Sequence, residues 1–373
     1  MQTATVSAAP DDRIEAFGAA IDRIRERVEA EIGAEDLAYL KKVDRFSRAM
    51  EIAGRLLIHV SVEPVGFGAG VVALWLHKQL QATEVGHTVL HGTFDKIDGA
   101  DAYRSKSFRW QTPIDEESWR QTHNIRHHGF TNIAGRDPDI HFGPIRWTEH
   151  TPYHPRHRGQ LRKALLLMAH FGIGINLQYT GLADFLEPEG QGDFTGDRSL
   201  ATFRASLRRA MRKFVPYYGR ELVLFPALAG PFWWKVLLGN WLTELMRDAY
   251  SAATIYCGHV GEDVADYPAG TRAGSRARWY VMQVEATNDF EVPLPMSILC
   301  GALDRQIEHH LFPRFPTNRL REVAPEVRAA CEAHGVRYHT DSWPGTLRKV
   351  VRRLRQLSRP TAREAVQRIR AAA

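Results

Sequence analysis

Three compact clusters of histidine constrain this chain more than any other feature of its sequence. The segments HTVLH, HNIRHH and QIEHH hold seven of the 17 histidines. A single histidine is usually structural, but seven imidazoles in three clusters are too many for one structural zinc site, which takes four ligands. The fold must therefore bring three distant segments together, and the number of donors suits two metal ions. The seven histidines are His87, His91, His123, His127, His128, His309 and His310.

The spacing within the clusters suits helices. His87 and His91 are four residues apart, which places both imidazoles on one face of a helix, one turn from each other. Thr88 stands where a zinc protease helix carries its glutamate general base, so that chemistry is not expected. Gln306 lies one turn before the last histidine pair on the same helical surface. Imidazole binds zinc, copper, iron and nickel, so the donors alone do not select the metal.

The composition of the 373 residues is that of a folded globular chain. Charged residues make up 25% and hydrophobic residues 44%, which excludes a fibre, a disordered tail and a disulfide-dense miniprotein. Three widely spaced cysteines support neither a disulfide framework nor a thiolate metal site, and they favour a reducing compartment. The N-terminus has no basic segment followed by an apolar one, so we expect no secretory signal.

Helical patterns dominate, and strand signals are weak, so we predict an all-α fold. Apolar residues recur at steps of three and four between Asp11 and Ile32, which predicts an amphipathic helix. Three apolar segments are each long enough to cross about 30 Å of hydrocarbon, the first of them either once or as two short passes broken at Glu63 and Pro64. Polar residues interrupt the segments, so buried helices remain the alternative. The mean hydropathy of the whole chain is −0.33, so membrane spans must be few and diluted by long polar segments. The three segments are 52–80, 161–185 and 222–242.

These segments divide the chain into three expected regions. Residues 1–50 form an amphipathic helical region, 51–313 the main domain, and 314–373 a basic helical region. The net charge is +6, and the surplus crowds the C-terminus, where it suits either anionic lipid or a solvated helix face. No aromatic residues interleave with the basic ones, so we expect no nucleic acid partner. The basic residues are Arg348, Lys349, Arg352, Arg353, Arg355, Arg359, Arg363, Arg368 and Arg370.

From about Glu84 to Pro313 the chain resembles the membrane fatty acid desaturase family. The three clusters are similar to the three histidine boxes of that family, and QIEHHLFP is the most specific match. The flanks EVGHTVLHG and DPDIHFG resemble bacterial acyl desaturases. The resemblance implies a membrane-embedded helical bundle with a cytosolic helical cap and a non-haem di-iron site. It implies as iron ligands the seven clustered histidines and His259, which matches a further family histidine in YCGHVGEDV.

The resemblance also implies an activity and its partners. The activity is O₂-dependent desaturation of a long acyl chain carried on CoA, on a carrier protein or in a lipid, with no catalytic residues beyond the metal ligands. The His-Pro-Gly-Gly pattern of a haem-binding module is missing, so the electrons must come from a separate donor such as a ferredoxin with its reductase. The family places its site at the cytosolic face of a membrane, here the bacterial inner membrane, in contact with lipid. Basic residues before residue 161 agree with that orientation.

Acidic and amide side chains near the boxes are candidates to hold the outer nitrogens of the ligand imidazoles. The first box lacks the aspartate that often follows its first histidine, which leaves Glu84, one turn before His87, as the expected carboxylate. His141 is close to the second box but is not expected to bind metal. The main candidates are Glu84, Gln306, Asp137 and Glu308, with Asp95, Asp139, Glu262 and Asp263 as further ones. Expected lining residues of an apolar acyl tunnel are Trp75, Phe171, Trp233, Trp234 and Trp241.

Two other functions fit the same residues. A hydroxylase or ketolase uses the same scaffold and differs in the fate of the oxidised carbon. Gln306 in the third box favours desaturation over these reactions, by family resemblance alone. A non-enzymatic membrane protein that binds iron or zinc needs exchangeable ligands distributed across the bilayer, whereas these clusters all fall on one side of it. Neutral imidazoles are required for coordination, so activity is expected to fall below about pH 6.5.

Overall fold

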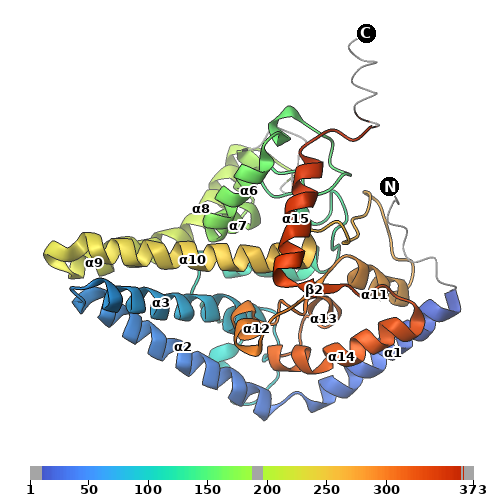
Figure 1. Cartoon of the computed structure of the whole chain (residues 1–373), viewed down its shortest axis with the longest axis horizontal. Helices are drawn as coiled ribbons and strands as arrows, with labels where there is room; N and C mark the ends of the chain where they lie inside the picture. Colours follow the sequence, from blue (N-terminus) through green and yellow to red (C-terminus); the bar gives the residue numbers. More distant parts are fainter. Residues whose placement is uncertain (1–10, 187–195, 363, 365–373) are drawn as a thin grey trace, which may run out of the picture.

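The structure is a computed structural model that describes residues 11–186, 196–362 and 364. Within these ranges the chain is mainly helical, with two short strands, which confirms the all-α prediction (Figure 1). The longer helices are α1 (Asp11–Glu31), α2 (Ala34–Val60), α3 (Pro64–Leu80), α6 (Gln160–Ala169), α7 (Phe171–Tyr179), α8 (Leu200–Tyr218), α10 (Trp233–His259), α11 (Arg276–Glu285), α14 (Thr317–His334) and α15 (Trp343–Leu357). The shorter ones are α4 (Thr88–Leu90), α5 (Glu116–Trp119), α9 (Phe225–Leu228), α12 (Leu294–Cys300) and α13 (Gln306–Leu311).

The remaining regular elements are short. Three π-helical segments widen the chain at η1 (Gln81–His87), η3 (Arg120–His127) and η7 (Gly219–Leu224). The 3₁₀ turns are η2 (Asp101–Tyr103), η4 (Pro138–Ile140), η5 (Pro155–His157), η6 (Ala183–Phe185) and η8 (Gly230–Phe232). Strands β1 (Asp289–Glu291) and β2 (Thr340–Ser342) pair in parallel, with Phe290 opposite Asp341. This pair joins the chain after α11 to the start of α15.

The N-terminal helix α1 is amphipathic, as predicted. Its apolar residues at steps of three and four are buried, and they pack on α11 and α14 at one end of the molecule (Figure 1). Gly33 separates α1 from α2, and α2 continues through residue 50. The domain boundaries near residues 50 and 313 stay predictions. The buried stripe consists of Ile14, Phe17, Ile21, Ile24 and Val28.

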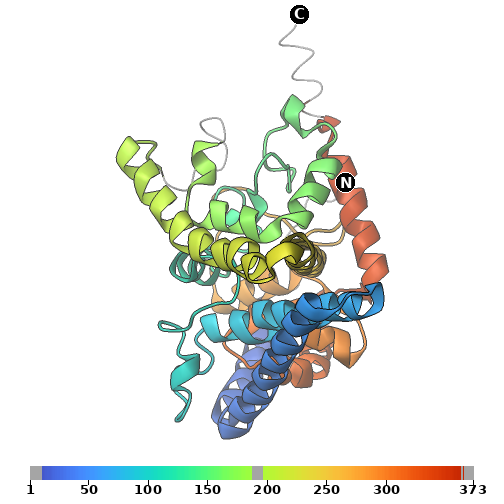
Figure 2. The ribbon, with the colours of Figure 1, turned by 90° about the vertical axis from the view of Figure 1, so that its left-hand side faces the viewer.

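The apolar segment 52–80 contains a hairpin break between α2 and α3. The carboxylate of Glu63 accepts hydrogen bonds from the backbone of Val65 and Gly66, and Pro64 occupies the first turn of α3. Helix α10 lies along α3, so α2, α3 and α10 form one elongated bundle (Figure 1). Figure 2 looks onto the end of this bundle, where α9 and the start of α10, in yellow, lie beside the blue helix pair.

The other two apolar segments are not single helices, contrary to the prediction of one span each. Segment 161–185 divides at His170 into α6 and α7. Segment 222–242 divides at Gly230, whose φ of 54° is left-handed, and Pro231 next to it has no N–H to continue a helix. No helix in the ranges 11–186 and 196–362 is both long and apolar enough to cross a membrane.

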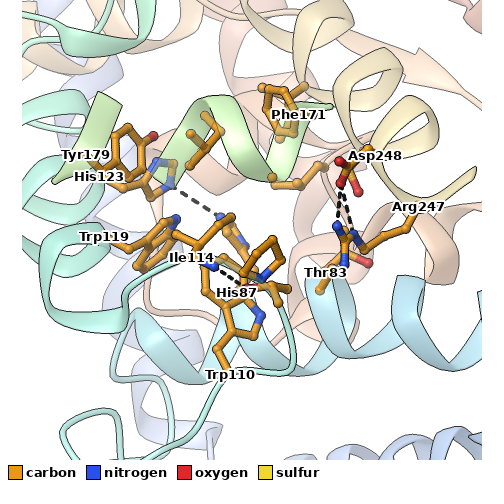
Figure 3. Close-up of a pocket in the computed structure, with 18 of the residues that line it drawn as sticks. Thr83, His87, Trp110, Ile114, Trp119, His123, Phe171, Tyr179, Arg247 and Asp248 are labelled. Atoms are coloured by element: carbon orange, nitrogen blue, oxygen red, sulfur yellow. Dashed lines mark hydrogen bonds and ion pairs between the residues drawn. The ribbon is translucent and has the colours of Figure 1, made fainter. Parts of the chain in front are cut away.

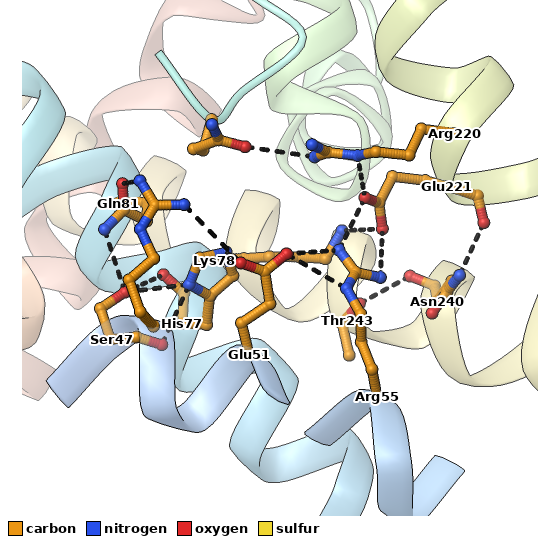
Figure 4. Close-up of polar contacts among 12 residues, drawn as sticks. Ser47, Glu51, Arg55, His77, Lys78, Gln81, Arg220, Glu221, Asn240 and Thr243 are labelled. Atoms are coloured by element: carbon orange, nitrogen blue, oxygen red, sulfur yellow. Dashed lines mark hydrogen bonds and ion pairs between the residues drawn. The ribbon is translucent and has the colours of Figure 1, made fainter. Parts of the chain in front are cut away.

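A buried network of charges explains the polarity of the bundle. Lys78 of α3 binds Glu221 at 2.7 Å (Figure 4). It also contacts Glu244 of α10. Arg55 of α2 binds the same Glu221 at 2.9 Å. Burial opposes ionisation of Glu221, but Lys78 and Arg55 outweigh it and hold its pKa well below the ordinary value. Two of the polar residues that interrupt the apolar segment 52–80, Arg55 and Lys78, are therefore paired with a buried carboxylate.

The basic C-terminal helix α15 is partly neutralised inside the fold. Lys349 binds Asp263 at 2.8 Å, and Arg353 binds Asp266 at 3.2 Å. Glu262 binds Arg352 at 2.9 Å. These pairs fix α15 to the loop that follows α10. Arg363, Arg368 and Arg370 lie outside the described residues.

Candidate metal centre

Two π-helical segments carry part of the first two histidine boxes. The segment η1 ends at His87, and η3 contains His123 and His127. The wider turn is visible in the backbone, where the N–H of His128 donates to the carbonyl of His123, five residues back, at 3.1 Å. Such π turns occur frequently at functional sites because they re-aim side chains that an α-helix would direct elsewhere. The four-residue spacing of the histidines predicted helices here but not this widening.

The first group of histidines gathers His87, His91, His123 and His309 from three segments. One ring nitrogen from each lies within 4.8 Å of the others, and all four residues are buried. The Nε2 atoms of His87 and His91 are 3.4 Å apart, and those of His87 and His123 are also 3.4 Å apart. These nitrogens point at one small space, as ligands of one ion do.

The second group consists of His127, His259 and His310, whose ring nitrogens also lie within 4.8 Å of one another. His259 comes from the last turn of α10 and His310 from α13. His128 lies between the two groups, because its ring stacks on His310 and its Nε2 atom is 3.3 Å from that of His123. The structure thus brings all eight predicted ligands into one cluster.

Carboxylates hold the outer nitrogen of His127. Its Nδ1 atom donates to Asp137, at 3.0 Å, and Asp139 lies 3.5 Å away. Asp139 also accepts a hydrogen bond of 2.8 Å from the hydroxyl of Tyr179 and lies 3.7 Å from Nδ1 of His123. Asp137 was a leading candidate for this role and Asp139 a further one. Tyr179 was missed, since it lies about 50 residues beyond the second box, with no local signal.

Amide and hydroxyl groups hold two further imidazoles. The side-chain amide of Gln306 lies 2.8 Å from Nε2 of His259, although its Oε1 atom has no partner within the described residues. The Nδ1 atom of His310 lies 3.0 Å from the amide oxygen of Gln283 and 3.2 Å from the hydroxyl of Thr131. Gln306 was a candidate for this role. Thr131 stands four residues after His127, so helical spacing is a signal that could have found it.

The other acidic candidates bind elsewhere. Glu84 lies at the opposite side of η1, where it binds Arg321 at 2.7 Å and accepts from Thr317 at 2.7 Å. Glu308 accepts from Tyr338 at 3.1 Å. These two carboxylates link the box helices to the C-terminal part rather than to an imidazole. Asp95 binds Ser105, Glu262 and Asp263 bind α15, and Nε2 of His141 accepts from the backbone of Gly135.

Burial and mutual proximity make most of these imidazoles hard to protonate. Burial, with a contribution from His127, lowers the pKa of His87 to about 3. His127 is the exception, because Asp137 and Asp139 outweigh its burial and raise its pKa to about 9. Burial and neighbouring imidazoles also lower the pKa values of His91, His123, His128, His259, His309 and His310 well below the ordinary value.

The buried nitrogens of the cluster are better suited to bind metal ions than to form hydrogen bonds with one another. Five of them have no hydrogen-bond partner within the described part of the chain, and unsatisfied buried polar atoms are costly. Neutral imidazoles without partners are the donor set that a transition metal requires, and four of the five atoms belong to rings whose pKa is lowered, His127 being the exception. The five atoms are Nε2 of His127, His309 and His310 and Nδ1 of His128 and His259.

A pocket opens beside the cluster, and its walls are mainly apolar. The imidazoles of His87 and His123 border it, together with Trp119, Ile114 and Phe171 (Figure 3). Five residues of α10 line the pocket, and four of them recur at every fourth position: Arg247, Ser251, Ile255 and His259. The fifth, Asp248, forms a buried ion pair with Arg247 at the end far from the histidines. The pocket therefore follows three turns of one helix.

Of the aromatic residues expected to line an apolar tunnel, Phe171 does so. Trp75 packs edge-on against Tyr250. Trp233, Trp234 and Trp241 are about half exposed and lie along the first turns of α10.

Comparison with known proteins identifies the family. The family model described as fatty acid desaturase matches residues 64–342. The chain belongs to the fatty acid desaturase family. This desaturase is 30% identical, over 359 residues, to the NADPH-dependent stearoyl-CoA 9-desaturase of Mycobacterium tuberculosis. That match covers 94% of this chain and 81% of the relative. The family resemblance expected from the histidine boxes is thereby confirmed.

Less similar desaturases match smaller shares of the chain. Fatty acid desaturase 3 of Homo sapiens is 24% identical over 329 residues, which covers 83% of this chain and 65% of that protein. Delta(5) fatty acid desaturase A of Dictyostelium discoideum is 24% identical over 265 residues, covering 68% of this chain and 55% of that protein. The protein is therefore an oxidoreductase, a fatty acid desaturase of lipid metabolism. Its histidine cluster fits iron, the metal that the resemblance implies.

Proposed function

We propose that this desaturase uses O₂ and two iron ions to introduce a C=C double bond into a long acyl chain. The observation that carries the proposal is the convergence of two groups of buried imidazole nitrogens beside a mainly apolar pocket. Bound iron would supply the redox chemistry that activates O₂ and removes hydrogen from adjacent methylenes. The protein's part is to hold the ions, to exclude water and to fix the depth of the chain.

The ligand assignment follows from the two groups. One ion is assigned to His87, His91, His123 and His309, and the other to His127, His259 and His310. His128 lies between the groups, and we assign it to the same centre.

The residues behind the ligands set ring orientation. A carboxylate that accepts the outer N–H fixes the tautomer and leaves the inner nitrogen free for a metal. Asp137 does this for His127, and Gln283 is placed to do it for His310. Gln306 holds His259 differently, because its amide nitrogen, 2.8 Å from Nε2 of that ring, donates and does not accept.

The acyl chain is proposed to lie in the pocket along α10. From Arg247 to His259 the helix rises by about 18 Å, at 1.5 Å per residue. The methylenes next to the histidines are the ones to be oxidised, and the distance to the far end limits the accepted chain. Trp119 and Phe171 exclude water from this space. We propose acyl-CoA as the substrate, because the M. tuberculosis relative is named for stearoyl-CoA.

Electrons are proposed to come from an external carrier, such as a ferredoxin with its reductase. That relative is named NADPH-dependent, which implies an electron donor for it.

We also propose that the desaturase is held at the bacterial inner membrane by the end of its bundle, with the histidine cluster on the cytoplasmic side. Large apolar side chains gather there on the α2–α3 turn and around α9, and Val62 is 93% exposed. Exposed tryptophans are typical of membrane interfaces, and Trp233 and Trp234 are both more than half exposed. Other exposed apolar residues at this end are Leu56, Val60, Val65, Val223, Leu224, Leu228 and Phe232.

The test combines metal analysis of detergent-purified protein with fatty acid profiling of cells that express it. The wild type is compared with a His309→Ala, His310→Ala variant, and the exposed His170→Ala serves as control. We expect about two irons per chain and new unsaturated acyl chains, both lost in the double variant and both kept in the control. Hydroxylated acyl chains in place of unsaturated ones would indicate the hydroxylase alternative. Zinc or no metal, with unchanged lipids, would contradict the proposal.

A further inference from the structure

A second pocket lies behind the histidine cluster. It is formed by residues 129–136, residues 270–273 and helix α11, and it shares no lining residue with the first pocket. The first pocket touches His87, His123 and His259, whereas the second contacts the cluster from the side of His310. The cluster therefore has two separate approaches.

Two buried side chains connect the second pocket to the cluster. Thr131 and Gln283 line the pocket, and both lie within hydrogen-bond distance of Nδ1 of His310. The hydroxyl of Thr131 is also 2.9 Å from the amide oxygen of Gln283. The pocket floor is thus in direct contact with the outer nitrogen of a proposed metal ligand.

The pocket carries positive charge. Its lining includes Arg136 and Arg272, both exposed, and no acidic side chain. Arg136 lies over the ring of Phe130, with 3.8 Å from its guanidinium carbon to the ring centroid, which holds the cation at the rim. Trp279 adds a second aromatic surface. Clustered cations around an apolar patch attract and orient an acidic partner.

The location suits a water-soluble partner. Helix α11 lies at the opposite end of the molecule from α9, whose surroundings carry the exposed apolar residues (Figure 1). A membrane at the α9 end leaves the second pocket accessible.

We propose that this pocket is the docking surface of an acidic one-electron carrier protein, and that the electron passes through Thr131 and Gln283 to His310. The inference rests on the proposed desaturation. Loss of two hydrogens from two methylenes releases two electrons and two protons, while reduction of O₂ to two waters consumes four of each. The carrier supplies the other two electrons in two docking events, each oxidising one carrier by one electron, and solvent supplies two protons.

The experiment measures how fast a reduced [2Fe–2S] ferredoxin is oxidised by the iron-loaded protein, in the absence of acyl substrate. The variant Arg136→Glu, Arg272→Glu is compared with Arg204→Glu, Arg208→Glu, which makes the same charge change on exposed positions of α8. We expect the rate constant at low salt to fall at least about tenfold in the first variant, with a flatter salt dependence, and to change less than about twofold in the second. Dithionite, which needs no docking surface, restores single-turnover product.

Three outcomes overturn the docking surface. The first is unchanged ferredoxin oxidation in the variant Arg136→Glu, Arg272→Glu. The second is a wild-type protein that dithionite reduces but that does not oxidise ferredoxin. The third is a raised KM for acyl-CoA in that variant with unchanged ferredoxin oxidation, which would make the pocket a nucleotide site. Failure of the proposed function gives a different result. In that case the dithionite-reduced wild type forms no unsaturated product from acyl-CoA and O₂, while the rates of ferredoxin oxidation still report on docking.

Discussion

The Nδ1 atom of His127 lies 3.0 Å from a carboxylate oxygen of Asp137, and both side chains are fully shielded from solvent. Asp137 also accepts hydrogen bonds from the backbone of Asn132 and Asp139, which keeps its carboxylate in place. A charge fixed in this way increases the basicity of the imidazole that faces the second group of nitrogens.

Asp137→Asn keeps the shape of the side chain and removes its charge. We expect metal affinity of the second group to fall by about 10- to 100-fold, as measured by iron retained against a graded chelator. Asp95→Asn, whose carboxylate binds Ser105, is the control. Equal iron retention by Asp137→Asn and wild type would show that the carboxylate does not support the metal.

Metal-free protein is expected to lose stability in acid. Burial lowers the pKa of His87 to about 3, whereas an unfolded chain binds this proton near pH 6.5. The unfolded state therefore binds more protons below pH 6.5, and the stability that depends on neutral His87 is lost as the pH falls toward 3. At pH 5 this one group lowers the free energy of unfolding by about 2 kcal/mol.

The contribution of His127 to stability changes with pH in the opposite direction. Its raised pKa, about 9, gives a contribution that is fully present below pH 6.5 and is lost as the pH rises through 9. Urea unfolding of chelator-treated protein at pH 7.5 and pH 5 checks the prediction. A midpoint that does not fall at pH 5 would contradict it, since one raised pKa is opposed by several lowered ones.

Gly86 lies where the first π segment meets Trp110. A Cβ atom at this position would stand 2.0 Å from the indole nitrogen, which donates to the carbonyl of Gln81 at 2.9 Å. We expect Gly86→Ala to destabilise the protein by about 3 kcal/mol through overpacking and to lower its iron content. Gly68→Ala on α3 meets nothing within 4 Å and is expected to stabilise by about 0.5–1 kcal/mol. Thermal unfolding and metal analysis of the pair give the comparison.

Ser251 lies two turns before His259 on the lining of the first pocket. Ser251→Phe fills the pocket beyond the histidines, so we expect conversion of the longest acyl chains to fall about tenfold or more while shorter ones are still converted. Ser251→Ala removes the hydroxyl without adding volume and is expected to keep the chain-length profile. Product analysis with acyl-CoA substrates of increasing length tests this. An unchanged profile in Ser251→Phe would place the chain elsewhere.

Trp233 and Trp234 are 52% and 56% exposed at the end of the bundle. Replacing both with serine is expected to reduce binding to phospholipid vesicles about tenfold or more, because interfacial burial of aromatic surface is lost. Leu294→Ser, on α12 and 62% exposed, is the control. Sedimentation with vesicles measures the bound fraction, and equal binding of all three proteins would exclude this end as the lipid contact.

Sequence patterns predicted the elements with a strong local period. The stripe from Ile14 to Val28 gave α1, and histidine spacing selected the residues that the fold brings together. The break at Glu63 was also predictable, since a capping carboxylate precedes a proline there.

Long-range pairing was not predictable in the same way. Glu84 is close to His87 in sequence, yet Arg321, 237 residues away, determines its direction. Lys78 interrupts an apolar segment, and its partner Glu221 comes from a segment 143 residues later. One-dimensional periodicity carries no information on such partners, so a charged residue in an apolar run could not be recognised as the centre of a buried network.

The π segments make the spacing of the boxes sensitive to chain length as well as to residue type. Each α-helical residue turns the chain by about 100°, so removal of one residue from 120–122 that restored an α-helix would rotate every earlier side chain relative to His127 and His128. A single-codon deletion upstream of the second box would leave all eight histidines in the protein and still separate their rings. Alignments of this region therefore need to be judged by the count of residues between the boxes as well as by the histidines themselves.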